Sequence, residues 1–268
     1  MKLDRLMHDL NDDTKYRFHL AKTEPGGRHP LHALARSRED WLNWQVYRGN
    51  AKERFPKNCV VSFAQISGDR FLFGGIFDIV DRAGETYEVA YTEAYEELIG
   101  RLIVNYRGKN KRATVFTPGY IYENTEVAGI YEHKFKGEPF KSFDEINHGF
   151  SEIELIVKNN LNDWRVALSS VYGVYLISDK TTGKHYVGSA YGQEGVWGRW
   201  NQYVYNFHGN NADLVELFEK KTEAYFRESF KFSILEVLSS AATSESIIAR
   251  EKLWKQKLLS NEFGYNRN

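Results

Sequence analysis

The sequence has a single cysteine, Cys59, among its 268 residues. One cysteine cannot form an internal disulfide, and this is typical of proteins from a reducing cytoplasm. No run of 18 apolar residues occurs, and the first eight residues lack the apolar stretch of a signal peptide. We therefore expect a cytoplasmic protein with no membrane partner, and these absences argue against a disulfide scaffold or a membrane-spanning protein.

The sequence also lacks a net charge. Lysine and arginine together number 36, and aspartate and glutamate together also number 36. No overall field draws the protein to nucleic acid, so any attraction to DNA must come from local basic patches. Aromatic residues are plentiful, at 15% of the chain, and the length suits two domains better than one.

Alternating apolar residues between positions 59 and 136 predict a β-rich first domain. About six short runs separated by tight turns are typical of a small barrel or sandwich. Gly74 and Gly75 interrupt the longest run and predict a bulge or a corner. A helix is expected to begin at Ser37, and the spacing of its two tryptophans favours a packed helix face over a platform for base stacking.

One loop of this first domain is basic. Residues 105–112 hold four basic residues and one tyrosine and contain no acidic residue. Such a loop can follow a phosphate backbone, with the tyrosine either stacked on a base or packed inside the protein. The alternative is an ordinary solvated loop between two strands. The candidate DNA contacts are Tyr106, Arg107, Lys109, Lys111 and Arg112.

A polar connector follows the β-rich region. Residues 151–158 predict a short amphipathic helix, which the polar residues 159–163 end. We place the domain boundary at about residue 165. The first domain then comprises residues 1–165, including the helical connector, and the second comprises residues 166–268.

The stretch from Gly173 to Gly188 predicts a β-hairpin with one tyrosine on each arm. The first arm is apolar and β-branched, a polar segment with a glycine follows, and the second arm contains Tyr186. Alternation places Tyr175 on the opposite face from Val174. The flanking glycines remove bulk where another backbone or a ligand comes close. A core hairpin with two packed tyrosines explains these residues equally well.

Three helices and a third strand complete the expected second domain, and the second of these helices is a long charged one over residues 211–228. A helix over residues 196–206 places Arg199 and Tyr203 four residues apart and therefore on one face. Residues 230–238 alternate as a strand that can pair with the hairpin. The expected fold class is α+β, with a small antiparallel three-stranded sheet flanked by helices. A β-rich, barrel-like domain with an N-terminal helix precedes it.

The last long helix carries a carboxylate within its apolar stripe, which is predicted to comprise Ile247, Ile248, Trp254, Leu258 and Leu259. Glu251 lies four residues after Ile247 and three before Trp254. A carboxylate in this position is costly unless it pairs with a basic side chain or binds a cation. The partner is therefore either a nearby lysine or arginine, or a divalent metal. A single carboxylate suits one Mg²⁺ ion that keeps several of its waters.

The hairpin resembles the signature of the GIY-YIG nuclease superfamily. The matching residues are Gly173-Val174-Tyr175 and, after ten residues, Tyr186-Val187-Gly188. Members of that family carry an arginine on the helix after the hairpin, a glutamate on a later helix and an asparagine near the end. Arg199, Glu251 and Asn266 occur here in that order. The resemblance covers roughly residues 166–268.

The resemblance implies a DNA endonuclease that hydrolyses phosphodiester bonds with Mg²⁺ or Mn²⁺ and no small-molecule cofactor. Glu251 would bind the metal, and Arg199 would contact the scissile phosphate. Tyr175 or Tyr186 would activate the attacking water; Lys184 lies beside Tyr186 in the sequence and could assist it.

The remaining family positions also have matches in this chain. Tyr203 fits the position four residues after the arginine, where the family has histidine or tyrosine. Asn266 would hold the metal shell or brace the glutamate. Gly173 and Gly188 would support the hairpin at its two ends.

Nuclease domains of this family usually take their specificity from an attached domain. The resemblance therefore implies a restriction or phage-defence endonuclease, with residues 1–165 reading a base sequence or a modified base. A structure-specific repair nuclease is one alternative, and a nucleic-acid-binding module without catalysis is another. Double-strand cutting by single active sites would favour a homodimer.

Overall fold

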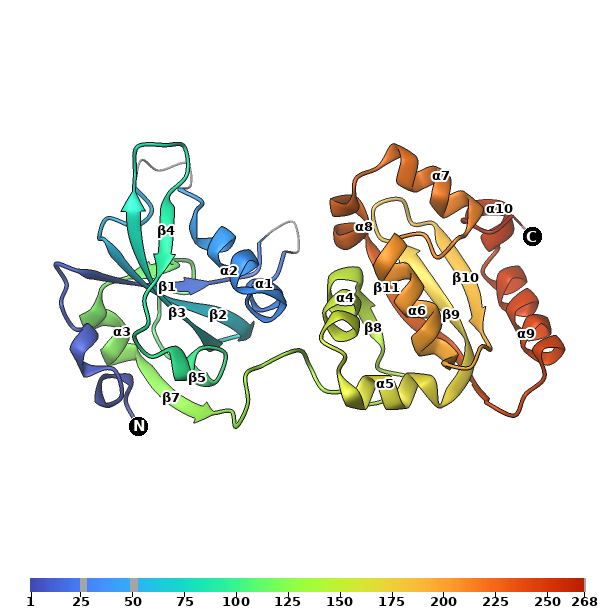
Figure 1. Ribbon diagram of the computed structural model, residues 1–268, viewed down its shortest axis with the longest axis horizontal. Helices are drawn as coiled ribbons and strands as arrows, with labels where there is room; N and C mark the ends of the chain where they lie inside the picture. Colours follow the sequence, from blue (N-terminus) through green and yellow to red (C-terminus); the bar gives the residue numbers. More distant parts are fainter. Residues whose placement is uncertain (25–27, 49–52, 268) are drawn as a thin grey trace. The chain divides into compact units, whose positions relative to one another are not determined.

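The computed structural model describes residues 1–24, 28–48 and 53–267. They divide into two compact units, Met1–Phe135 and Lys136–Asn268, each with its own hydrophobic core (Figure 1). Both units combine helices with β-sheet, which confirms the α+β class. Within the described ranges, no helix is long and apolar enough to cross a membrane.

The first unit is built on one curved, seven-stranded sheet, which confirms the β-rich domain. The strand order is β6-β1-β2-β3-β5-β7, with β4 paired to β3, and only β1 and β2 run parallel among these pairs. The strands are β1 (Tyr16–Ala21), β2 (Cys59–Ser67), β3 (Arg70–Asp81), β4 (Glu88–Tyr91), β5 (Leu102–Tyr106), β6 (Val115–Phe116) and β7 (Thr125–Ile130). The helices are α1 (Pro30–Arg36), α2 (Arg38–Gln45) and α3 (Pro118–Asn124), with 3₁₀ turns at Leu3–Arg5, His8–Leu10 and Glu96–Leu98.

The predicted glycine bulge lies in the middle of β3. The register against β2 shifts there, because Ser62 pairs with Gly75 while Phe63 pairs with Phe73. Gly74 is the extra residue, and Gly75 has a φ of +114°, which L side chains rarely adopt. The bulge bends β3, so its first part pairs with β5 and its last part with β4.

The bulge also forms the packing site for helix α2. The indole of Trp41 on α2 is fully buried and donates to the carbonyl of Gly74 at 2.8 Å. A Cβ at position 74 would lie 2.4 Å from that indole. Ser37 caps α2 as expected, by accepting from the Asp40 amide. The tryptophans of this helix therefore form a packed face.

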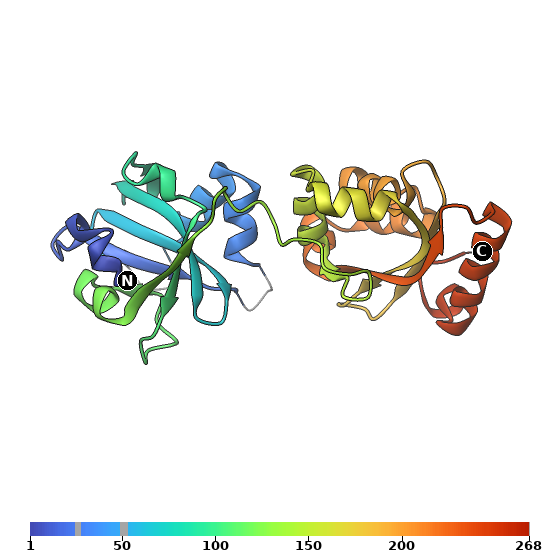
Figure 2. The same ribbon diagram turned by 90° about the horizontal axis from the view of Figure 1, so that it is seen from below.

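The second unit is a four-stranded antiparallel sheet in the order β10-β9-β11-β8, so it has one strand more than predicted. Helices α4, α5 and α6 lie over one face of the sheet, and α9 lies beside β10 (Figures 1 and 2). The strands are β8 (Asn147–Gly149), β9 (Val171–Asp179), β10 (His185–Ala190) and β11 (Phe230–Ser239). The helices are α4 (Phe150–Lys158), α5 (Asn162–Ser169), α6 (Gly195–Asn206), α7 (Ala212–Lys220), α8 (Glu223–Ser229), α9 (Ser244–Lys257) and α10 (Ser260–Phe263).

The boundary between the units lies at residue 135, earlier than the predicted residue 165. The connector belongs to the second unit because its apolar residues complete that unit's core. Phe150, Ile153 and Trp164 are buried there with residues of the hairpin and α6. The strand β8 in the same segment pairs with β11. The predicted single helix over residues 211–228 is also corrected, since Lys221 and Thr222 separate α7 from α8.

A buried carboxylate ties the hairpin to the end of the chain. Asp179, where β9 ends, accepts hydrogen bonds from the hydroxyls of Tyr225 and Tyr265, both at 2.7 Å. It also accepts from the amide of Thr181 at 2.9 Å. Burial by itself raises the pKa of Asp179, but these donors outweigh it and the net shift is downward. This anchor holds the C-terminal segment against β10.

Candidate active site

The hairpin brings its two tyrosines together on one face. Tyr175 on β9 pairs across the hairpin with Gly188 on β10. The Tyr175 ring passes over this glycine, and a Cβ at position 188 would lie 2.4 Å from the Tyr175 hydroxyl. Gly173 is needed for a different reason: a Cβ there would lie 2.6 Å from the carbonyl oxygen of Glu236, at the bulge of β11. Both glycines of the predicted motif are thus required by packing.

Helix α6 places Arg199 beside the buried tyrosines. Its Nε donates to the hydroxyl of Tyr175 at 3.0 Å, and its guanidinium lies 5.2 Å from the ring of Tyr203. The hydroxyls of Tyr175 and Tyr203 are hydrogen-bonded to each other at 3.1 Å. Gln202 accepts from Nη1 of Arg199 at 2.7 Å. These contacts hold the arginine in one orientation, which a solvated helix charge would not have.

The environment fixes the protonation of this cluster. Burial raises the pKa of Tyr175, and the nearby Tyr186 raises it further. Burial also raises the pKa of Tyr203 well above its usual value. Burial by itself lowers the pKa of Arg199, but the surrounding phenol oxygens outweigh it and the net shift is upward. Tyr175 and Tyr203 are therefore neutral at ordinary pH, and Arg199 is charged.

Glu251 approaches from α9, on the other side of β10. Its carboxylate accepts a hydrogen bond from the hydroxyl of Ser189 and lies 2.6 Å from the ammonium of Lys255. Side chains alternate along a strand, so Ser189 and Tyr186 point to opposite faces of β10. Since β10 is an edge strand, groups from both faces meet around it.

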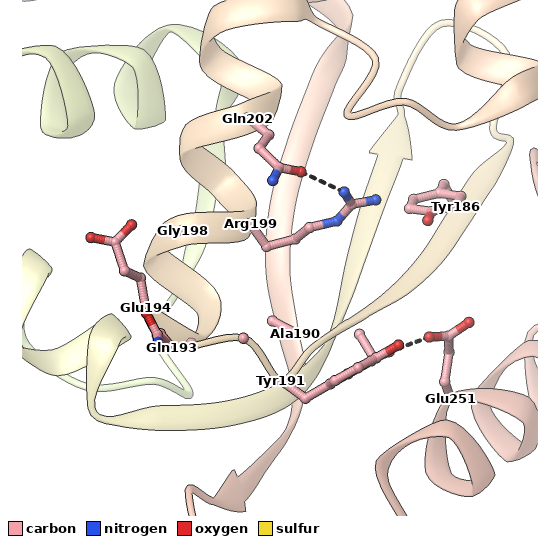
Figure 3. Close-up of a pocket in the computed structure, with 12 residues that line it drawn as sticks. Tyr186, Ala190, Tyr191, Gln193, Glu194, Gly198, Arg199, Gln202 and Glu251 are labelled. Atoms are coloured by element: carbon pink, nitrogen blue, oxygen red, sulfur yellow. Dashed lines mark hydrogen bonds between the residues drawn. The ribbon is translucent and has the colours of Figure 1, made fainter. Parts of the chain in front are cut away.

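One pocket of about 600 Å³ joins these groups. Tyr186, Arg199 and Glu251 all line it, together with Ser189 and the loop that follows β10. In Figure 3, Arg199 and Glu251 extend from different helices toward the space beside β10, and the ring of Tyr186 lies near the guanidinium. The arrangement places a fixed cation, a phenol and a carboxylate around a space open to a ligand.

Comparison with known proteins places this unit in a family. Residues 171–266 match the sequence model described as the GIY-YIG catalytic domain. The chain belongs to the GIY-YIG family. Among solved structures, it is similar to the catalytic domain of intron endonuclease I-TevI in a mutant form, with 30% identity over 37% of this chain and 94% of that one, and a TM-score of 0.29. A second structure, the catalytic domain of homing endonuclease I-TevI, has 31% identity over 36% and 98% of the two chains, also with a TM-score of 0.29.

No match was found among the curated proteins with which the sequence was compared. The family assignment makes the chain a nuclease, a hydrolase of phosphodiester bonds. The match covers the hairpin, α6, α9 and Asn266 in the order predicted from the sequence.

Three residues predicted for the GIY-YIG site have structural positions instead. Tyr203 is fully buried and holds Arg199 and Tyr175 in place, so it does not face the pocket directly. The ammonium of Lys184 lies over the ring of Tyr265, 5.4 Å from the centroid. Asn266 uses both atoms of its amide on the backbone of Val187, at 2.9 and 2.8 Å. It braces the edge of β10 rather than a metal shell or Glu251.

The stripe predicted on the last helix is narrower than expected. Ile247 is buried, whereas Ile248 and Leu259 are exposed. Glu251 has a lysine partner one turn along its own helix, which is one of the two alternatives that the sequence left open. Lys255 and Ser189 were both missed as site residues. The signal for Lys255 was its position four residues after Glu251 on the same helix, and the signal for Ser189 was its position directly after Gly188.

The donor set of the pocket fits a hard divalent cation with a largely water-filled shell. Glu251 offers carboxylate oxygens and Ser189 a hydroxyl oxygen, the ligand types that Mg²⁺ prefers. Glu194 also lines the pocket, but its carboxylate points away from Glu251 (Figure 3). Across residues 1–24, 28–48 and 53–267, no three His, Cys, Asp or Glu side chains cluster as a metal cage would require.

The basic loop of the first unit is organised around its tyrosine. Tyr106 is buried, packs against Phe116, and its hydroxyl donates to the carbonyl of Asn110 at 2.9 Å. This corrects its assignment as a base-stacking residue: the ring belongs to the core. Lys111 pairs with Asp69 at 2.8 Å, while Lys109 and Arg112 are exposed. Arg107 is exposed and lies 4.0 Å from Glu126.

Gly188→Ala tests the close approach of Tyr175 to β10. The added methyl would overlap the phenol, so we expect a loss of about 1–3 kcal/mol in the free energy of unfolding, the usual cost of overpacking. Gly192→Ala is the matched control, because a Cβ there has nothing within 4 Å. Urea unfolding measures both. Equal stability of the two variants would contradict the packing described here.

Proposed function

We propose that this protein is a divalent-metal-dependent DNA endonuclease of the restriction or phage-defence type, with its first unit serving as the reader of DNA. The observation that carries the nuclease part is that Tyr186, Arg199 and Glu251 line one and the same pocket. A cation, a phenol and a carboxylate can serve phosphodiester hydrolysis as the phosphate-binding group, the general base and the metal ligand. The family assignment supplies the reaction class.

Arg199 is the phosphate-binding group in this proposal. Its Nε is held by Tyr175, and Gln202 holds Nη1, so the guanidinium is oriented before substrate arrives. A preorganised positive charge stabilises the extra negative charge that develops on the phosphate in the transition state. Its planar fork suits a phosphate better than the point charge of a lysine would.

Tyr186 is the better candidate for the general base. Tyr175 is fully buried, hydrogen-bonded to Arg199 and Tyr203, and held neutral by its raised pKa. Tyr186 lines the pocket and lies near the guanidinium of Arg199. A free phenol has a pKa near 10, so general-base catalysis by a phenol at pH 7 to 8 needs roughly 3 to 4 kcal/mol of stabilisation of its ionised form.

Glu251 would hold the metal, with Ser189 orienting its carboxylate. A divalent cation bound there supplies positive charge for the departing 3′ oxygen. The protein's part is to place that carboxylate across β10 from Tyr186, so that attack and departure take place on different sides of one phosphate.

The first unit is proposed as the reader because the nuclease pocket itself offers few groups that could distinguish bases. A curved sheet with an exposed basic loop offers a surface for contact with the phosphates of DNA. The first unit could read either a base sequence or a modified base, so the deciding experiment compares cleavage of several DNAs. Plasmid and phage DNA in unmodified, methylated and hydroxymethylated forms are incubated with Mg²⁺ or with EDTA.

Cleavage that needs Mg²⁺ and prefers one DNA supports the whole proposal. Equal cleavage of all intact duplexes argues against a modified-base reader. Cleavage of branched or damaged DNA alone would point to a repair nuclease instead. Binding to DNA without cleavage under any of these conditions would contradict the endonuclease proposal.

The basic loop gives a separate prediction. Lys109→Gln with Arg112→Gln removes two exposed positive charges. If both contact phosphates, the slope of log Kd against log salt falls by about 2, near one unit for each phosphate contact. Fluorescence anisotropy with a labelled duplex at several salt concentrations measures the slope. Lys134→Gln with Lys136→Gln is the charge-matched control, and an equal loss in both double variants would contradict a specific role of this loop.

A further inference from the structure

Lys255 contacts the central carboxylate, yet the chemistry proposed above gives it no role. Its ammonium lies 2.6 Å from Oε1 of Glu251, one helical turn away on α9. The side chains are only 12% and 18% exposed, so water and salt screen this pair weakly. Ser189 donates to the other oxygen, Oε2. Both oxygens of the carboxylate are thus engaged by the protein's own groups.

This ion pair competes with a metal for the same oxygen atoms. A divalent cation held by Glu251 would bind through the same carboxylate oxygens that Lys255 and Ser189 contact. An ammonium on the same carboxylate would then face a double positive charge at close range, and the two repel. The ammonium must therefore leave, or the cation binds weakly.

The substrate offers the ammonium another partner. A lysine has a flexible four-carbon stem and binds phosphate oxygens as a point charge. Lys255 does not itself line the pocket, but its ammonium contacts a carboxylate that does, so a phosphate bound beside Glu251 would lie within reach of this flexible side chain. Movement of the ammonium from Glu251 to a phosphate frees the carboxylate at the moment when DNA is present.

We propose that Lys255 is a positioning residue that keeps the affinity of Glu251 for divalent cations low until DNA is bound. The inference rests on the proposed role of Glu251 as the metal ligand. Metal and DNA then bind cooperatively, because each favours the state in which Lys255 has left Glu251. Thermodynamic linkage makes the effect reciprocal: bound metal also tightens DNA binding by the same factor.

The test is a titration of the full chain with Mn²⁺, followed by electron paramagnetic resonance, with and without a nuclease-resistant phosphorothioate duplex. A titration of the duplex alone corrects for ions bound to DNA. Lys255→Gln is expected to bind Mn²⁺ at least about tenfold more tightly than the unchanged protein when DNA is absent. DNA should tighten Mn²⁺ binding by a similar factor in the unchanged protein and by much less in Lys255→Gln.

Three further variants make the result specific. Lys252→Gln removes the same charge from an exposed position on the same helix and is expected to behave like the unchanged protein. Lys255→Arg keeps the charge and should also keep the cooperativity. Lys255→Met is a second neutral side chain, which repeats the measurement if the glutamine variant folds poorly.

Equal Mn²⁺ affinity in Lys255→Gln and Lys252→Gln would overturn the inference while leaving Glu251 as the metal ligand. Weaker binding in Lys255→Gln would also overturn it, since Lys255 would then help to form the metal site. Glu251→Gln separates this failure from a failure of the proposed function. If that change leaves Mn²⁺ binding intact, the metal role of Glu251 and the inference fail together.

Discussion

Glu251→Gln is expected to lower the rate of DNA cleavage by on the order of a thousandfold or more, while DNA affinity in EDTA changes little. A metal at a departing oxygen stabilises the transition state by several kcal/mol, and each 1.4 kcal/mol of this stabilisation is a factor of ten in rate. The substitution keeps the size of the side chain, removes its charge and replaces one carboxylate oxygen by an amide nitrogen. Single-turnover cleavage and anisotropy binding on the same duplex measure the two quantities.

Glu194→Gln is the matched control for this prediction. Glu194 lines the same pocket and is exposed, but its carboxylate points away from Glu251 (Figure 3). Its loss should leave the cleavage rate within about threefold, as expected for a surface charge. Similar losses in both variants would mean that the general charge of the pocket, and no specific ligand, governs the rate. Normal cleavage by Glu251→Gln would remove the metal ligand from the mechanism.

Tyr186→Phe is expected to reduce kcat by about a hundredfold or more, the usual contribution of a positioned general base. The change removes one hydroxyl at the pocket and leaves the ring, so the free energy of unfolding should stay nearly constant. Cleavage kinetics at saturating Mg²⁺ together with urea unfolding give the two values. The expected signature is lost activity in a stable protein.

Tyr175→Phe should show a different signature. Its hydroxyl accepts from Nε of Arg199 and is bonded to Tyr203, so its removal leaves part of a buried network without a partner. We expect a loss of roughly 1–3 kcal/mol in stability and a smaller effect on kcat than at Tyr186. Full activity in both variants would end the tyrosine-base hypothesis. A larger kinetic loss at Tyr175 would reverse the assignment.

The local structure of the second unit could be read from the sequence because it depends on short-range patterns. The hairpin, helix α6 and strand β11 each follow from alternation or from the 3.6-residue period. The connector of residues 136–165 was assigned to the first unit, because its polar end resembles a domain linker. Only the packing of Phe150 and Trp164 against the hairpin and α6 shows that it belongs with the nuclease core.

The roles of individual site residues were harder to predict from the sequence. Asn266 and Lys184 match or adjoin the motif, yet their side chains bind Val187 and face Tyr265. Tyr106 lies in a basic loop, but its ring packs inward. A motif fixes the residue type and its place along the chain, whereas the direction of a side chain depends on neighbours that are distant in sequence.

The sequence by itself determined the family, the reaction class and the order of the groups that carry the chemistry, because these depend on residue identity and local spacing. The tertiary structure alone decided which groups share the pocket. It placed Tyr186 in the lining of the pocket and Tyr175 behind it, and it brought Glu251 into contact with Ser189 and Lys255. The physical reason is that α6 and α9 approach opposite faces of one edge strand, and no local pattern specifies such an approach.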